Sequence, residues 1–132
     1  MSELTSCTCG SSAHQKSTLV FACSGAANVG EIADRADRHL MADGVGPMFC
    51  LAGLGADIKP MIDATGKAGT NIVIDGCDKD CGRKVMQRVG VTNFHHVRVT
   101  DLDIEKVSRV WAQDEQVRQV VDFVRTEMSD SP

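Results

Sequence analysis

Short apolar runs alternate along the chain with segments in which apolar residues recur every three or four positions. The runs predict buried strands at residues 18–23, 46–51, 71–75 and 95–99. The helical spacing predicts helices at residues 29–43, about 58–68, about 80–89 and about 113–127. This alternation predicts a three-layer αβα fold, Rossmann-like or flavodoxin-like, with a four-stranded parallel sheet in the order 2-1-3-4.

The ends of the chain differ from its centre. Residues 1–17 are rich in Ser, Thr and Gly and lack apolar periodicity, so we expect a flexible tail that contains Cys7 and Cys9. Residues 18–128 then form one domain, which agrees with a length of 132 residues.

Two local signals concern the connections. Asn28, followed three residues later by Glu31, predicts a capping box at the start of the first helix. The stretch AGLGAD at residues 52–57 predicts a glycine turn.

Composition excludes several classes of protein. Hydrophobic residues make up 42% of the chain and charged residues 24%, which is ordinary for a globular domain. A net charge of -4 lacks the positive surface of a nucleic-acid binder. No apolar run approaches the roughly 20 residues of a membrane span, so we expect neither a nucleic-acid nor a membrane partner.

Six cysteines are the unusual feature of the composition. An even number raises the possibility of a disulfide framework, which is typical of small secreted domains. The first fifteen residues lack the basic and apolar regions of a secretory signal, and the chain has enough aliphatic residues for a core. We therefore expect a cytoplasmic, reducing location, where grouped cysteines bind metal or perform thiol chemistry.

Four cysteines coincide with the ends of predicted elements. Cys23 and Cys50 end the first two strands, Cys77 follows the third, and Cys81 lies in the first turn of the next helix. The carboxyl ends of parallel strands share one edge of a sheet, with neighbouring strands about 4.8 Å apart. Because zinc takes four thiolates in a closed structural site, the sequence predicts a zinc ion held by these four cysteines. An iron–sulfur cluster has the same ligand demand, and the spacing does not distinguish the two.

The same residues allow an enzyme as the alternative. Cys77 and Arg83 satisfy the C-x5-R pattern of cysteine-dependent phosphatases, although Asp78 and Asp80 in that loop would repel a phosphate dianion. The loop after Cys23 has the outline of the phosphate loop of arsenate reductases and small phosphatases, but without its arginine. A thiol-based redox enzyme or a phosphatase-like or arsenate-reductase-like enzyme using Cys77 or Cys23 thus stays open.

Other candidates carry less information. Asp75 and Arg83 are expected beside the metal ligands, where they would orient them or balance their charge. His96 is expected on the surface, at the strand end away from the cysteines. Cys9 and its neighbours Cys7 and His14 receive no assignment.

Four stretches of the chain, taken together, resemble the DGC-domain family, which is named after an Asp-Gly-Cys motif, here at residues 75–77. They are FACSGAANVGEIADR, MFCLAGLGA, IVIDGCDKDCGRK and HVRVTDLDIEK. The resemblance implies a small zinc-binding protein with four chelating cysteines at Cys23, Cys50, Cys77 and Cys81, and it implies no particular reaction. Asp78 and Asp103 depart from the uncharged residues expected at their positions, which adds acidity near the predicted site.

Overall fold

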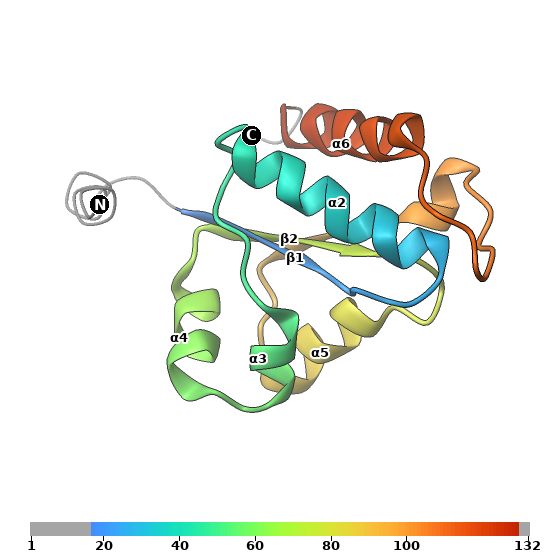
Figure 1. The fold of residues 1–132 in the computed structure, drawn as a ribbon. Helices are drawn as coiled ribbons and strands as arrows, with labels where there is room; N and C mark the ends of the chain where they lie inside the picture. The colour runs from blue at the N-terminus through green and yellow to red at the C-terminus, as the bar shows by residue number, and fades with distance from the viewer. Residues whose placement is uncertain (1–16, 130–132) are drawn as a thin grey trace.

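A parallel sheet forms the centre of the molecule in the computed structural model, which describes residues 17–129 (Figure 1). Its strands are β1 (Thr18–Ala22), β2 (Thr70–Asp75) and β3 (Phe94–Arg98), in the order β1-β2-β3. Both pairs of neighbours are parallel. The prediction of an α/β fold with a parallel sheet is confirmed, whereas the likeness to flavodoxin-type folds stays a prediction.

Helices cover both faces of this sheet (Figure 1). One face carries α2 (Asn28–Ala42) and α6 (Asp114–Ser129). The other face carries α3 (Leu51–Gly55), α4 (Lys59–Lys67) and α5 (Cys81–Val89). A short 3-10 helix, Val99–Leu102, follows β3.

The prediction of a fourth strand at residues 46–51 is wrong. Only one isolated parallel bridge, between Met48 and Val20, forms where that strand was expected beside β1. Val20 donates its N–H to Pro47 O and accepts the N–H of Phe49 on its carbonyl. The segment is too short to continue, because a proline without an N–H opens it and α3 begins directly after Cys50.

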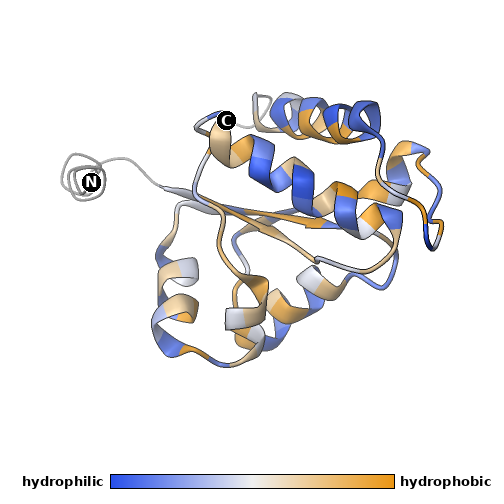
Figure 2. Ribbon diagram, in the orientation of Figure 1, coloured by the Kyte–Doolittle hydropathy of each residue, from blue (hydrophilic) through white to orange (hydrophobic). Residues whose placement is uncertain are grey.

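Side chains alternate between the two faces of the sheet, as the strand geometry requires. Val20, Ile72 and Ile74 face the core under α2 and α6, whereas Phe21 and Val73 face the core under α3 to α5. Figure 2 shows the resulting hydrophobic strands between helices whose outer sides are hydrophilic. Burial on both faces explains why the strands appear in the sequence as continuous apolar runs.

Two local expectations are corrected. The side chain of Asn28 does not cap α2, since the N-cap residue is Ala27 and no side-chain cap is formed. Glu31 instead accepts the N–H of Ala112 in a distant loop. The expected glycine turn at residues 52–57 largely forms the short helix α3.

The predicted flexible tail at residues 1–17 lies, apart from Ser17, outside the described residues, and so do its Cys7, Cys9 and His14. Within residues 17–129, none of the helices is both long enough and apolar enough to cross a membrane.

Asp37 on α2 is a carboxyl group fully buried inside the fold, with 0% exposure. Within the described part of the chain, neither of its oxygens has a hydrogen-bond partner. Burial, assisted by the nearby charge of Asp34, raises the pKa of Asp37 from 3.8 to about 9. The folded protein therefore holds this carboxyl protonated at neutral pH, while the unfolded chain releases the proton.

We expect Asp37→Asn to change how stability depends on pH. Because the unfolded chain binds fewer protons between about pH 4 and pH 9, the wild-type protein loses stability as pH rises through that window. The neutral amide has no such dependence, so the variant should gain on the wild type by up to about 1.4 kcal/mol per pH unit. Urea unfolding between pH 5 and pH 8 measures this, with the exposed Asp63→Asn as control. Parallel pH profiles for wild type and Asp37→Asn would show that the carboxyl is not protonated in the fold.

Candidate functional site

The four predicted metal ligands all lie at the carboxyl edge of the sheet or in the loops beside it. Cys23 directly follows β1 and Cys77 follows β2, and both are half-buried. Cys50 immediately precedes α3 and Cys81 is the first residue of α5, and both are exposed. All four are free thiols. Cys23 and Cys77 follow strands as the sequence predicted, whereas Cys50 follows only the isolated bridge at Met48.

The sulfur of Cys23 is held by backbone N–H groups. Gly76 donates to it at 3.3 Å, and Gly25 donates to it from the turn before α2. Burial is the largest influence on this thiol and raises its pKa, assisted by the charges of Asp75 and Cys81, while the two backbone donors oppose the rise. Since the thiolate is the form that reacts as a nucleophile, the raised pKa makes Cys23 a poor nucleophile without a further partner.

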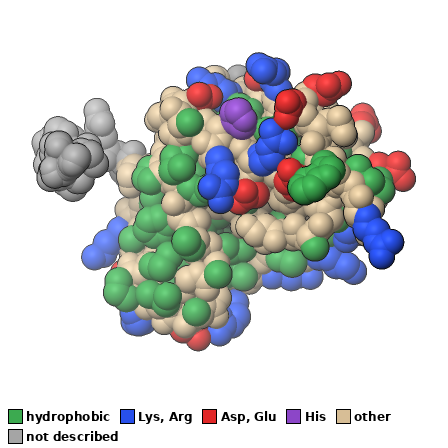
Figure 3. All heavy atoms as spheres, viewed as in Figure 1, with side chains coloured by type: hydrophobic (Ala, Val, Ile, Leu, Met, Phe, Trp, Pro, Cys, Tyr) green, Lys and Arg blue, Asp and Glu red, His purple; other side chains and the backbone are tan. Residues whose placement is uncertain are grey.

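Cys23 and Cys50 line one cavity of about 560 Å³ between α2 and α3. Apolar side chains such as Met48 and Phe49 form much of its wall, and Asp34 and Arg38 of α2 contribute charge. On this face, hydrophobic side chains gather over α3 and α4 and charged ones over α2 (Figure 3). Two of the thiols therefore open onto a shared hollow.

The four sulfur atoms do not lie at the spacing of ligands to one zinc ion. In the described residues 17–129, the only group of three or more His, Cys, Asp or Glu ligand atoms within 4.8 Å of one another is Asp75, Asp80 and His96. No three of the four cysteine sulfurs come that close. Thiolates bound to one zinc ion lie about 3.8 Å apart, given Zn–S bonds of about 2.3 Å.

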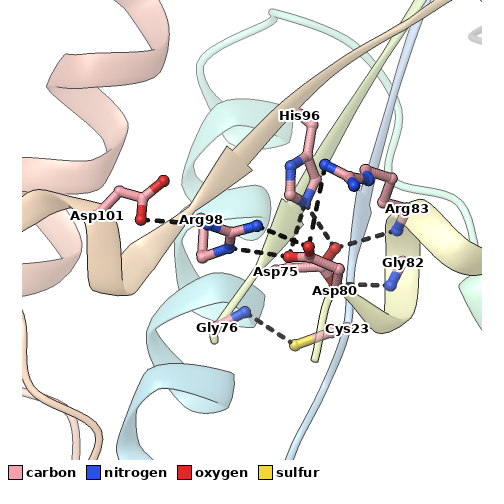
Figure 4. A network of polar contacts seen from close by, with 9 residues as sticks. All are labelled: Cys23, Asp75, Gly76, Asp80, Gly82, Arg83, His96, Arg98 and Asp101. Carbon is pink, nitrogen blue, oxygen red and sulfur yellow. Dashed lines mark hydrogen bonds and ion pairs between the residues drawn. The ribbon is translucent and has the colours of Figure 1, made fainter. Parts of the chain in front are cut away.

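The carboxylate of Asp75 joins β2 to the start of α5 (Figure 4). Its Oδ1 accepts the N–H of Gly82 at 2.7 Å, and its Oδ2 accepts the N–H of Arg83 at 3.0 Å. These are N–H groups of the first helical turn, which have no partner within the helix. Gly82 is required here, because a Cβ at that position would lie 2.6 Å from Val73 Cγ1 and 2.9 Å from Asp75 Oδ1.

His96 and Arg98 of β3 complete this polar network. His96 donates from Nε2 to Asp75 Oδ2 at 2.8 Å. Arg98 donates twice to Asp80, at 2.9 and 2.6 Å, and reaches Asp101 at 3.4 Å. The hydrogen bonds from Arg98 lower the pKa of Asp80, and the pKa of Arg98 is raised in turn.

Asp75, Asp80 and His96 are near enough to share a cation, but every oxygen of the two carboxylates already accepts a hydrogen bond. Asp75 accepts three N–H groups, and the guanidinium of Arg98 occupies both oxygens of Asp80. A metal ion would have to displace these donors and lie against the positive charge of Arg98. We therefore interpret the cluster as a structural lock that fixes the loop containing Cys77 between β2, β3 and α5.

The sequence analysis placed His96 wrongly. Its side chain is only 15% exposed, and it lies in the middle of β3, where it reaches Asp75 at the carboxyl end of β2. The sheet register pairs His96 with Val73 and Arg98 with Asp75, and alternation directs these side chains to the face that α5 covers. The alternation of residues 94, 96 and 98 was the available signal, but it has meaning only once the register is known.

Asp75 and Arg83, both expected beside the predicted ligands, have different surroundings. Asp75 is buried and bonded as described, whereas the Arg83 side chain extends toward Asp80, with its NH1 3.9 Å from that carboxylate. The phosphatase interpretation requires the Arg83 side chain to point toward the Cys77 loop and bind an anion there. The carboxylates of Asp75 and Asp80 at this position oppose anion binding, so the geometry does not favour that alternative.

We expect Asp75→Asn to destabilise the fold. The amide keeps one acceptor but loses the charge and the second acceptor oxygen that the α5 N–H groups and His96 use. Loss of such charge-assisted hydrogen bonds should lower the free energy of unfolding by about 2 kcal/mol. Urea unfolding measures the loss, and Asp78→Asn, an exposed residue of the same loop, should change stability by less than about 0.5 kcal/mol. Equal midpoints for the two variants would contradict the proposed role of Asp75.

Comparison with known proteins adds a family to this geometry. A family model described as "DGC domain" matches residues 19–124. A curated relative from Pseudomonas aeruginosa, named anaerobic and virulence modulator AnvM, is 32% identical over 93 residues, which cover 67% of each chain. No solved structure matches significantly.

Proposed function

The chain belongs to the DGC domain family, and from that premise we propose that it is a small cytoplasmic metal-binding protein. The resident ion in this proposal is zinc, held by Cys23, Cys50, Cys77 and Cys81. The observation that carries the proposal is the supply of four free thiols from three loops at one edge of the sheet. Thiolates are the ligands of structural zinc sites, and four of them close the coordination shell.

The surroundings of the thiols fit this donor set. Cys23 already receives two backbone N–H groups, and outer hydrogen bonds of this kind orient metal-bound ligands. Cys50 and Cys81 are exposed, so an ion can reach them from solvent. The bound zinc would link the loops after β1 and β2 to the starts of α3 and α5. Its contribution is structural, since four thiolates leave no open position for a substrate.

The relative from Pseudomonas aeruginosa is named as a modulator, and its name mentions no reaction. We extend to this chain a regulatory character, in which the metal-loaded state is the form that acts. Thiol-based redox chemistry at Cys77 and Cys81 is the alternative, because Cys81 is the first residue of α5 and Cys77 lies four positions before it, in the connection from β2.

We expect about one zinc ion per chain in protein purified without chelator, because four thiolates hold zinc tightly. Cys77→Ser or Cys81→Ser should release most of that metal, since each removes one of four ligands. Elemental analysis measures the content. The double variant Cys7→Ser, Cys9→Ser is the matched control, which removes two cysteines outside the proposed ligand set and should keep the zinc.

Other results would contradict the zinc assignment. A brown protein with stoichiometric iron would indicate an iron–sulfur cluster on the same four cysteines. Metal-free protein that forms a disulfide between Cys77 and Cys81 under mild oxidation would favour the redox alternative. Equal zinc content in all variants would show that these cysteines are not the ligands.

A further inference from the structure

The segment around Lys106 is fixed to the start of α2 by Asn28, a buried residue with 4% exposure. The Asn28 side chain donates from Nδ2 to Glu105 O at 3.0 Å and accepts the N–H of Val107 on Oδ1 at 2.7 Å. The backbone N–H of Asn28 also donates to Val107 O at 3.2 Å. Three hydrogen bonds thus hold the residues on both sides of Lys106, 77 to 79 positions away from Asn28 in sequence.

Lys106 itself is exposed, and its Nζ lies 3.5 Å from the sulfur of Cys77. Within the described residues, no other basic side chain donates a hydrogen bond to a cysteine sulfur. The other basic groups near this edge are directed to carboxylates, since Arg98 binds Asp80 and Arg83 approaches it. Among the described residues, the ammonium of Lys106 is therefore the positive charge in contact with a cysteine sulfur.

A zinc ion with four thiolates carries a net charge of about -2, from +2 on the ion and -4 on the ligands. Asp75 and the exposed Asp78 add negative charge around the same loop. A cation at contact distance from one ligand lowers the electrostatic free energy of that assembly, and salt in the solvent weakens the effect.

We propose that the positive charge of Lys106 stabilises the metal-loaded four-cysteine site. Asn28 holds the segment that places Lys106 against Cys77. The inference rests on the proposed function and extends it to a loop that supplies no ligand. It also explains why a buried asparagine at the start of α2 binds a distant segment in place of its own helix. Lys106 contributes no packing to the core, so its substitution leaves the fold intact.

The test is the affinity of the full-length protein for zinc, measured by competition with a chromophoric chelator at low and at moderate salt. We expect Lys106→Met to weaken zinc binding by about tenfold at low salt, which is the lower end of the range for groups outside the ligand set. Lys106→Arg should keep most of the affinity, because it restores the charge. Lys84→Met, an exposed lysine of α5, is the matched control and should bind as the wild type does. The difference between wild type and Lys106→Met should shrink as salt increases.

A double-mutant cycle tests the role of Asn28. If Asn28 acts through Lys106, Asn28→Ala should weaken zinc binding in the wild type but add little to Lys106→Met. A wild type that binds no zinc overturns the proposed function and this inference together. A wild type that binds zinc no more tightly than Lys106→Met overturns the inference alone. Equal losses in Lys106→Met and Lys106→Arg would overturn the charge role, and full additivity in the cycle would overturn the link to Asn28.

Discussion

The edge of the sheet is organised around one buried carboxylate, that of Asp75. Three strands and their crossover helices would pack without it, because the apolar faces alone determine the layers. Asp75 fixes the position of α5 relative to the sheet, since its two oxygens accept N–H groups from the first turn of α5 and from His96 of β3. The connection of residues 76–80 is thereby held at both ends. The positions of Cys77 and Cys81 follow from this contact, because one lies inside that connection and the other begins the helix.

An ion pair with Arg98 offsets the charge of Asp80 at this edge of the sheet. Asp80 has a left-handed backbone conformation, with φ of 53°, which an aspartate tolerates better than most residues, and this turn leads directly into α5. Its carboxylate pairs with Arg98, which offsets part of the cost of burying this acid. The thiols differ, because within the described residues only Lys106 brings a positive charge to one of them. Arg98 thus binds a carboxylate that fixes the loop, whereas Lys106 contacts a sulfur atom.

The sequence predicts the parts of the fold that depend on local pattern. Strands β1, β2 and β3 follow from apolar runs buried on both faces, and the cysteines at their ends follow from the topology. The segment at residues 46–51 is apolar like the strands, but its pairing depends on a proline and on where α3 begins. Its apolar composition alone therefore predicted a strand that does not form. His96 was missed because its neighbours are set by sheet register, a relation between distant residues that no single window of sequence contains. Asn28 has the side chain of a helix cap, yet a segment almost 80 positions away takes its hydrogen bonds.

The single bridge at Met48, in place of the expected fourth strand, has a consequence for how firmly the four cysteines are held. Cys23 and Cys77 follow strands that are paired within the sheet, and Cys81 begins a helix whose first turn is bonded to Asp75. Cys50 follows a segment joined to the sheet through two hydrogen bonds of Val20. Displacing that segment breaks these two hydrogen bonds and the ring contact of Phe49 with Phe21, and it leaves every ladder of the sheet intact. Of the four cysteines, Cys50 is therefore the one whose backbone we expect to move at the lowest cost in free energy.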